Sequence, residues 1–377
     1  KIMCGIVGIY HKKENACGDI YDALIQVQHR GQDAAGISTW DSSKMSTYKE
    51  LGLVTEVFKS SDSLESLTGN MGIGHVRYPT AGGDNVNEAQ PFYTANPVNV
   101  TLAHNGTLTN SEKLKEDLVK THFCQFNTSS DSEVLLNLFC YELHKINFRK
   151  LTKNHVYTAL KNVFEKCSGG YAVVMLVAGI GIVAFRDPKG IRPLSIGKNK
   201  RSYLIASESS AVTALEYNLL GDVAPGQVII INDDGQMEKK RLVKNAVHQP
   251  CIFEYVYFSR PDSTIDEISV HKSRLRMGDF LGDKILKEYK KIDVDVVIPV
   301  PDTSRTSAMQ VAHKLGVKYR EGFMKNRYIG RTFIMPGQSI RKRSVAQKLN
   351  PIEIEFKGKN VLLVDDSIVR GHTSKKI

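Results

Sequence analysis

The chain has 377 residues, of which 41% are hydrophobic and 24% are charged, and its formal net charge is +11. This length exceeds one ordinary hydrophobic core, so we expect two domains of a globular protein. No apolar run approaches the roughly 20 residues of a membrane span, and no basic segment with an apolar core marks a secretory signal. The six cysteines form no CxxC pair, which argues against a disulfide framework or zinc cluster and favours the reducing cytoplasm.

The first part of the chain is predicted to form an α+β domain. Residues 4–10 are predicted to be a strand, and 20–31 an amphipathic helix that ends at Gly31. Further strands are expected at 35–40, 46–54, 71–78, 100–106, 171–179, 181–188, 202–207 and 226–233. Helices are expected at 111–121, 131–145 and 155–167. Helices flanked by two groups of strands indicate helices packed on sheets.

The pattern changes after the polar stretch 232–249, which is the candidate linker. Beyond it, strands and helices alternate: we expect a helix near 271–290, a strand at 294–300, a helix at 304–315 and a strand at 360–366. Alternation with continuously apolar strands predicts a parallel, doubly wound α/β sheet. We therefore expect one domain over 1–240 and a second over 241–377.

The most specific stretch of the second part is VLLVDDSIVRGHTS, at 361–374. Its apolar residues predict a buried strand, with Asp365 and Asp366 at the carboxyl end, where open α/β sheets bind their ligands. The hydroxyl-rich loop and helix amides that follow suit a phosphate monoester. The two carboxylates suit ribose hydroxyls, or a Mg²⁺ that bridges to a diphosphate. An acidic turn or an exposed strand end would explain the acidic pair alone, but not the order of the whole stretch.

Positive charge is concentrated in KNRYIGRTF (325–333) and IRKRSVAQK (340–348). Such runs are most often a solvated face, but nucleic acid, a membrane surface or a small polyanion are alternatives. No RNP-like aromatic pattern, zinc finger or helix-turn-helix accompanies them. Together with the phosphate-binding stretch they favour a phosphorylated small molecule, so we expect neither a nucleic-acid nor a membrane partner.

The stretch MCGIVGIY places Cys4 directly after Met3. Removal of Met3 would leave Cys4 as the first residue, with a thiol and a free α-amine on one carbon. The unperturbed amine titrates near pH ~8 and the thiol near ~8.5, so one group can act as base for the other near neutrality. For an isolated cysteine the alternative is a buried side chain on an edge strand.

Two groups of motifs resemble known families. VLLVDDSIVRGHTS, VVIPVPDTS (296–304) and KNRYIGRTF resemble the phosphoribosyl-diphosphate (PRPP) signature, the diphosphate loop and the mobile lid of type I phosphoribosyltransferases. The glutaminase domain of N-terminal-nucleophile amidotransferases is similar to MCGIVGI, QHRGQDAAG (28–36), GIGHVRYPT (72–80), LAHNGTLTN (102–110) and NTSSDSEVL (127–135). Over essentially the whole chain, the combination resembles the glutamine PRPP amidotransferases. In that family the glutaminase half is an αββα sandwich.

The resemblance implies a role for each matching glutaminase residue. Cys4 matches the nucleophile, with its own freed α-amine as general base. Asn105 and the N–H of Gly106 match the oxyanion hole, which stabilises charge formed in the transition state. Arg77 matches the clamp on the glutamine α-carboxylate, and Asp131 the acceptor of its α-ammonium.

Each of these residues has an ordinary alternative when it is taken alone. Asn105 and Gly106 would form a hairpin turn, Asp131 a helix N-cap and Arg77 a surface charge. Their appearance together in the family's order disfavours this set of alternatives. Two further residues in matching motifs are expected only to give structural support: Arg30 and His75.

The resemblance also implies roles in the second domain. Asp365 and Asp366 match the ribose and Mg²⁺ contacts, and Ser304 matches a third Mg²⁺-linked position. The lid residues that close over the diphosphate correspond to Lys325, Arg327 and Tyr328. The 5′-phosphate loop corresponds to Ser367, Ile368, Val369, Arg370, Gly371, His372 and Thr373, with a histidine where a smaller residue is expected.

The implied reaction uses glutamine and PRPP. Cys4 would release ammonia from glutamine, and the ammonia would displace diphosphate from C1 of PRPP to give 5-phosphoribosylamine, the first committed product of purine synthesis. The resemblance further implies a homo-oligomer with purine nucleotides as feedback inhibitors. Some relatives carry an iron–sulfur cluster, and Cys251 lies near one ligand position. We favour a buried structural cysteine there, and the cluster stays open.

Two other function classes compete with this interpretation. A glucosamine-6-phosphate synthase shares the glutaminase half, but the loop at Asp365 argues against its sugar-isomerase domains. A PRPP-sensing regulator that binds nucleic acid would not need the glutaminase residues. Two residues precede Met3 as an unexplained overhang, and the chain stops at Ile377, where the phosphate-binding helix begins. We therefore expect a C-terminally truncated enzyme.

Overall fold

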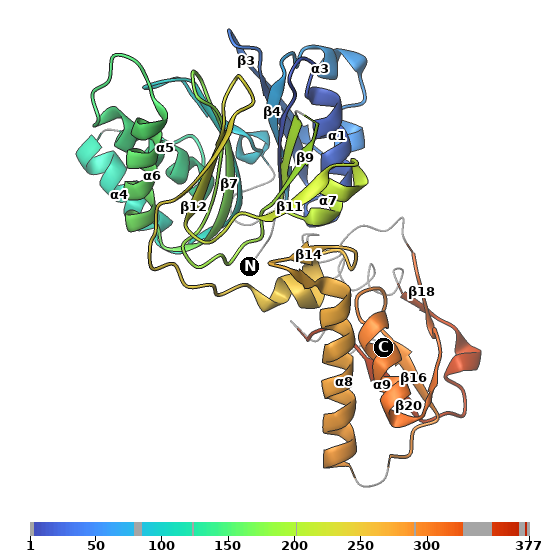
Figure 1. Ribbon diagram of the computed structural model, residues 1–377. Coiled ribbons are helices and arrows are strands. Elements are labelled where there is room, and N and C mark those ends of the chain that lie inside the picture. Colours follow the sequence, from blue (N-terminus) through green and yellow to red (C-terminus); the bar gives the residue numbers. More distant parts are fainter. Residues whose placement is uncertain are drawn as a thin grey trace. The chain divides into compact units, whose positions relative to one another are not determined.

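The computed structural model describes residues 4–78, 85–122, 124–200, 202–289, 292–326, 349–368 and 374. It divides into two compact units (Figure 1). Unit 1 consists of Lys1–Cys251 with Thr264–Glu267, and unit 2 of Ile252–Ser263 with Ile268–Ile377. Seven of the predicted site residues lie outside the described residues: Arg327, Tyr328, Val369, Arg370, Gly371, His372 and Thr373.

Unit 1 is built on two antiparallel β-sheets. The first sheet has the order β11 (Asn218–Asp222), β9 (Ser195–Asn199), β10 (Ser202–Ala206), β1 (Gly5–Tyr10), β4 (Met71–Arg77), β2 (Ala34–Trp40) and β3 (Met45–Leu51). The second has the order β13 (Met237–Arg241), β12 (Gln227–Ile231), β8 (Gly181–Arg186), β7 (Gly169–Val177), β6 (Val100–Leu108) and β5 (Phe92–Thr94). The central strands of both sheets, among them β1, β2, β4, β7 and β8, are buried on both faces, because each sheet is packed between the other sheet and a helical layer.

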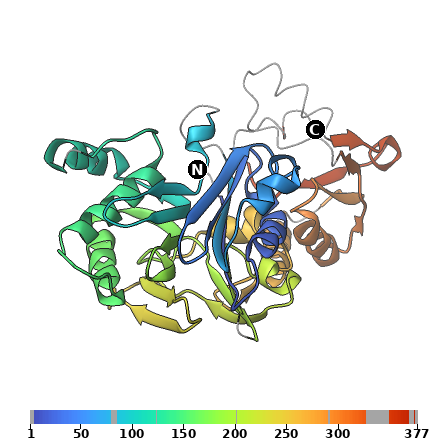
Figure 2. The same ribbon diagram turned by 90° about the horizontal axis from the view of Figure 1, so that it is seen from above.

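Helices cover the outer face of each sheet (Figures 1 and 2). The first sheet carries α1 (Cys17–Gln26), α2 (Val54–Val57), α3 (Ser61–Glu65) and α7 (Ser209–Ala214), and the second carries α4 (Ser111–His122), α5 (Asp131–His144) and α6 (Lys153–Lys166). Ile6 and Val174 belong to the core between the sheets, Leu24 to that under α1, and Phe139 to that under α5. This arrangement confirms the predicted αββα sandwich.

The candidate linker is wrong over part of its length. Residues 237–241 form β13, which pairs with β12 in a continuous register from Gln227 with Arg241 to Ile231 with Met237. Its residues 238–241 are exposed and charged. Charged side chains are common on edge strands because they discourage pairing with other chains, so a polar stretch need not be a linker.

Unit 2 contains a parallel sheet of the order β17 (Lys318–Tyr319), β16 (Val296–Pro299) and β20 (Val361–Val364). Helix α9 (Arg305–Leu315) packs on β16 and on α8 (Val270–Glu288). The predicted α/β alternation is confirmed. The unit also contains a π-helical turn (Glu254–Phe258) and the small antiparallel pair of β18 (Phe323–Lys325) with β19 (Leu349–Pro351). A second small pair joins β14 (Thr264–Ile265), which belongs to unit 1, to β15 (Ile268–Ser269), which belongs to unit 2. Across the described parts of both units, no helix has the length and apolarity needed to cross a membrane.

Candidate functional site

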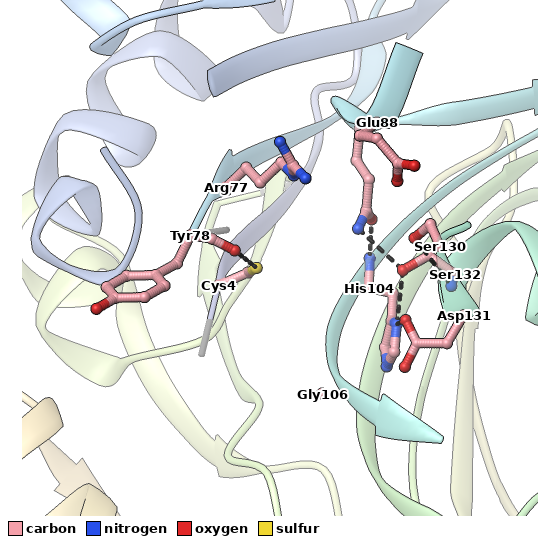
Figure 3. A pocket seen from close by; sticks show the side chains of 10 residues that line it. Cys4, Arg77, Tyr78, Glu88, His104, Gly106, Ser130, Asp131 and Ser132 are labelled. Atoms are coloured by element: carbon pink, nitrogen blue, oxygen red, sulfur yellow. Dashed lines mark hydrogen bonds and ion pairs between the residues drawn. The ribbon is translucent and has the colours of Figure 1, made fainter. Parts of the chain in front are cut away.

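A pocket in unit 1 brings together four of the predicted glutaminase residues. Cys4 precedes β1, Arg77 ends β4, Gly106 lies in β6 and Asp131 begins α5. The pocket is also lined by Tyr78, Glu88, Gln90, His104, Ser130 and Ser132. Figure 3 shows Cys4 and Arg77 on one side, facing His104, Asp131 and Ser132 on the other. The antiparallel register that pairs Gly5 with Val76 brings Cys4 beside Arg77.

The thiol of Cys4 is buried in this pocket. Burial raises the pKa of the thiol to about 11, although a hydrogen bond to the Tyr78 carbonyl and the charge of Arg77 act in the opposite direction. The sulfur lies 4.0 Å from that carbonyl oxygen. At neutral pH the thiol is therefore protonated, and it needs a base before it can act as a nucleophile.

Asn105 holds the main-chain nitrogen of Cys4. Its Oδ1 accepts a hydrogen bond from that nitrogen at 3.0 Å, and both residues are buried. Its Nδ2 is buried without a hydrogen-bond partner among the described residues. Leaving a buried donor unpaired costs about 1–3 kcal/mol, so this amide is suited to an acceptor that a ligand supplies.

Gly106 leaves no room for a side chain. A Cβ atom there would lie 2.2 Å from the Gly170 carbonyl oxygen and 2.8 Å from Nε2 of His104. The Gly170 contact is with backbone on the neighbouring strand β7, which cannot give way as the end of a flexible side chain can. Only glycine fits this position beside Asn105.

The carboxylate of Asp131 is held by the main chain at one oxygen. Oδ2 accepts a hydrogen bond from the Leu108 N–H at 2.8 Å, and Oδ1 lies 3.8 Å from Nδ1 of His104. The alternative that Asp131 is the N-cap is wrong, because Ser130 is the N-cap of α5 and accepts from the Ser132 N–H at 3.2 Å. Asp131 thus lines the pocket together with the buried Arg77.

A buried polar network that the sequence did not reveal supports this wall of the pocket. Nδ1 of His104 lies 2.8 Å from Ser132 Oγ, which also accepts from Gln90 Nε2 at 2.9 Å. Gln90 Oε1 in turn accepts from the His104 N–H at 2.7 Å. Burial lowers the pKa of His104, which keeps the imidazole neutral. His104 directly precedes Asn105, but Gln90 carries no local signal.

A second network lies behind Cys4. Arg30 is fully buried, and its Nε donates to the Cys4 carbonyl at 3.0 Å. Its Nη1 pairs with Oε1 of the buried Glu208 at 2.5 Å. His75, also buried, lies 3.3 Å from the His104 carbonyl, and burial lowers its pKa to about 3. Sequence reasoning missed Glu208, which lies 178 positions from Arg30.

In unit 2 the predicted acidic pair lies at the carboxyl edge of the sheet. β16 and β20 are parallel and in register, with Pro299 beside Val364, so the loops that follow both strands are neighbours. Asp366 accepts hydrogen bonds from the hydroxyls of Thr303 and, at 2.6 Å, Ser367. Burial and the adjacent Asp366 raise the pKa of Asp365 to about 6.

Within the described residues, no hydrogen bond or ion pair joins the acidic pair to the other predicted residues Ser304, Lys325 and Ile368. Ser304 is buried and donates its hydroxyl to the Val300 carbonyl, whereas its neighbour Thr303 contacts Asp366. Lys325 forms an ion pair with Asp302. Ile368 is exposed. Cys251 is partly buried.

The acidic pair offers the chemistry that a magnesium ion requires. Within the described ranges no three or more His, Cys, Asp or Glu residues gather as metal ligands. Mg²⁺ commonly uses only one or two carboxylates and takes its remaining ligands from substrate phosphates and water. Burial, together with repulsion from the Asp366 carboxylate, raises the pKa of Asp365, and a bound cation reduces such repulsion. These residues therefore fit Mg²⁺.

Comparison with known proteins connects the two units to two domain families. A glutamine amidotransferase domain matches residues 75–214, and a phosphoribosyl transferase domain matches residues 264–377. An amidophosphoribosyltransferase of Pseudomonas aeruginosa is 54% identical over 379 residues, which cover 100% of this chain and 75% of that protein. That of Escherichia coli is 51% identical over 381 residues, with the same two shares covered.

A solved structure is similar over nearly the whole chain. Glutamine PRPP amidotransferase from B. subtilis, complexed with ADP and GMP, is 39% identical with a TM-score of 0.85. The alignment covers 99% of this chain and 78% of that one. The likeness therefore extends over both units.

Proposed function

The chain belongs to the amidophosphoribosyltransferase family, and from this premise we propose how its residues divide the reaction between two sites. The family assignment makes it a glutamine-dependent glycosyltransferase that uses PRPP in purine biosynthesis. The pocket at Cys4 is the proposed site of glutamine hydrolysis. The loops after β16 and β20 are the proposed site of amination.

At the first site, Cys4 is proposed to be the first residue of the working enzyme. Its free α-amine takes the thiol proton while sulfur attacks the side-chain carbonyl carbon of glutamine. Asn105 Nδ2 and the Gly106 N–H donate hydrogen bonds to the carbonyl oxygen and stabilise the negative charge that forms on it. The C–N bond breaks, the proton goes to the departing ammonia, and water then hydrolyses the thioester to glutamate.

Arg77 and Asp131 orient the glutamine at this site. The guanidinium binds the α-carboxylate through two parallel N–H donors, and Oδ1 of Asp131 accepts from the α-ammonium. The other oxygen of Asp131 stays with the Leu108 N–H, which fixes the carboxylate in place. Two opposite charges across the pocket would distinguish glutamine from simple amides.

The observation that carries this assignment is the environment of Cys4. The thiol is buried with a pKa raised to about 11, its own main-chain nitrogen is held 3.0 Å from Asn105 Oδ1, and Nδ2 of the same asparagine lacks a partner among the described residues. Three groups that the reaction needs thus lie together. They are the Cys4 thiol as nucleophile, the Cys4 nitrogen as its base, and Asn105 Nδ2 as a hydrogen-bond donor for the oxyanion.

At the second site, Asp365 and Asp366 are proposed to hold the PRPP ribose and Mg²⁺. When bound, the ion would neutralise charge on the departing diphosphate. Thr303, Ser367 and the Asp366 main chain keep the two carboxylates in position. Of the residues expected in the lid and in the 5′-phosphate loop, three are described: Lys325 is the last residue of β18, and Ser367 and Ile368 follow β20.

The two half-reactions have to be connected without bulk water. Released ammonia is protonated in neutral water and then lacks the lone pair that attacks C1 of PRPP, so we propose an internal passage. Purine nucleotides are proposed as feedback inhibitors, because the B. subtilis relative is complexed with ADP and GMP. We also propose that the enzyme is a homo-oligomer and that it works in the cytoplasm.

The second site is tested by Asp366→Asn in the native enzyme. The change removes a charge and keeps one of the two acceptor oxygens that Thr303 and Ser367 use, while the new amide N–H can donate to the other hydroxyl. We expect ammonia-dependent release of diphosphate to fall by at least about 10- to 100-fold, the range that the loss of groups around metal sites gives. Glutamate release from glutamine, assayed without PRPP, should stay within about twofold, since the chemistry of the Cys4 pocket does not use Asp366.

Glu353→Gln is the matched control, since it removes a charge from an exposed residue of the same unit. Both activities should survive in this control. An Asp366→Asn enzyme that aminates PRPP at the wild-type rate over a full Mg²⁺ titration would remove the acidic pair from the proposal.

A further inference from the structure

Four residues at the tip of the β14–β15 hairpin have an unexpected place in the fold. Thr264–Glu267 belong to unit 1, although the chain on both sides of them belongs to unit 2. Ile265 is almost completely buried, and both Asp266 and Glu267 have positive φ angles, +48° and +65°. The proposed chemistry uses none of these residues, yet they are held by a dense set of contacts.

Asp266 neutralises a buried arginine. Its two carboxylate oxygens accept from Nη1 and Nη2 of Arg186 at 2.6 and 2.8 Å, and the Arg186 side chain is fully buried. Burial raises the pKa of Asp266, but the hydrogen bonds and charge of Arg186 outweigh it and hold the pKa below its usual value. A buried guanidinium needs such a partner, because an unpaired buried charge is very unfavourable.

Arg186 is in turn part of the strand row that carries a proposed oxyanion donor. Asn105 on β6 pairs with Ala172 on β7, and Ala172 pairs with Arg186 on β8. Side chains in one cross-strand row lie on the same face of a sheet. In the next row, Gly106 pairs with Tyr171, whose N–H donates to the Asp187 carboxylate at 3.2 Å.

The same tip also reaches the network behind the nucleophile. The Thr264 N–H donates to Ser209 Oγ at 2.7 Å. Ser209 follows Glu208, whose carboxylate holds Arg30, and Arg30 donates to the Cys4 carbonyl. The hairpin tip is therefore connected to the glutaminase pocket in two ways. It contacts Ser209, which is next to the network that holds Cys4, and it contacts Arg186, which lies in the same strand row as Asn105.

We propose that the hairpin tip holds the glutaminase pocket in its working geometry, with Asp266 as a positioning residue that acts through Arg186. Glutamine hydrolysis then depends on a segment whose flanking chain belongs to the phosphoribosyltransferase unit. The inference rests on the proposed roles of Cys4, Asn105 and Gly106. It adds to them a residue outside the pocket on which their alignment depends.

Asp266→Asn in the native enzyme tests this role. The variant leaves a neutral amide opposite the buried guanidinium, so Arg186 loses its charged partner and one of the two side-chain acceptors, and is held mainly by the main-chain carbonyls of Gly190, Arg192 and Val223. We expect kcat for glutamine hydrolysis to fall about tenfold or more, because small misplacement of transition-state donors costs rate. The KM for glutamine should change less than about threefold, since Arg77 and Asp131 are untouched. Ammonia-dependent amination should stay within about twofold.

Two companion variants sharpen the result. Glu267→Gln is the matched control, because it removes a charge from the same tip at an exposed residue, and it should leave the kcat for glutamine hydrolysis unchanged. Ser209→Ala removes the acceptor of the Thr264 N–H without unpairing a charge. It should lower the same kcat by about threefold or more, again with little change in KM. If thermal unfolding shows that Asp266→Asn does not fold, the kcat of Ser209→Ala for glutamine hydrolysis decides the test.

The outcomes separate this inference from the proposed function. A folded Asp266→Asn enzyme with wild-type kcat for glutamine, or one that loses glutamine- and ammonia-dependent activity equally, would overturn the positioning role. If Asp266→Asn does not fold, a wild-type kcat in Ser209→Ala overturns it instead. Cys4→Ala is assayed beside these variants. If Cys4→Ala still hydrolyses glutamine, the proposed function itself has failed, whatever the hairpin variants show.

Discussion

Cys4→Ala is expected to abolish glutamine hydrolysis and to leave amination by added ammonia intact. Without the thiol no thioester forms, and loss of a nucleophile that acts in concert with its base costs at least about a thousandfold in rate. The amination residues Asp365 and Asp366 belong to the other unit. Glutamate release and ammonia-dependent diphosphate release, measured on one preparation of the native enzyme, give the two rates.

Cys17→Ala is the matched control for this experiment. Cys17 is also buried, and burial raises the pKa of its thiol to about 11 as well, but it lies in α1 among apolar residues and not in the pocket. The control should lose some stability and keep both activities. Equal loss of both activities in Cys4→Ala would contradict the division of the reaction between two sites.

The second large effect is expected for Asp131→Asn. Loss of the partner of a buried ammonium costs on the order of 3–5 kcal/mol, so kcat/KM for glutamine should fall by about two to four powers of ten. The asparagine Oδ1 can still accept from the Leu108 N–H, and Ser130 remains the N-cap, so the start of α5 is preserved. Steady-state glutamate release measures the effect.

A glutamine analogue without the α-amine provides the specificity control. Its hydrolysis should be nearly indifferent to Asp131→Asn, because it has no ammonium to bind. Asp117→Asn, on the neighbouring helix α4, should leave both substrates unaffected. If Asp131→Asn impairs glutamine and the analogue alike, Asp131 has a structural role and is not a ligand.

The regular elements were the most predictable part of the fold. The helix expected at 131–145 is α5, Asp131–His144, and the apolar strand expected at 294–300 contains β16, Val296–Pro299. The apolar residues of the helix recur at helical spacing, and the strand was indicated by a short, continuous apolar run in a region where strands and helices alternate. The β14–β15 hairpin was missed because strands of two residues carry no periodic signal, and β13 because an exposed edge strand has the composition of a linker.

The site was predictable where a motif carried it and unpredictable where only tertiary contact creates it. Cys4 was singled out by its place directly after Met3, whereas Arg77, Gly106 and Asp131 were singled out only through the family resemblance, since neither spacing nor periodicity joins segments so far apart. Glu208 was missed because nothing near it in the sequence indicates its pairing with a distant arginine. The same holds for Gln90, Ser132 and Thr303, whose roles are defined by the side chains that the fold brings to them.

The form of the N-terminus tests the central claim most directly. The native enzyme is prepared with Cys4 first and, separately, with Met3 retained before it, and each form is verified by intact mass. With Met3 retained, the Cys4 nitrogen is a peptide N–H that donates to Asn105 and has no basic lone pair. A thiol with a pKa of about 11 is then only about one part in 10⁴ ionised at neutral pH. We predict that only the Cys4-first form hydrolyses glutamine, while both forms aminate PRPP with added ammonia. Equal glutamine hydrolysis by the two forms would show that the base lies elsewhere.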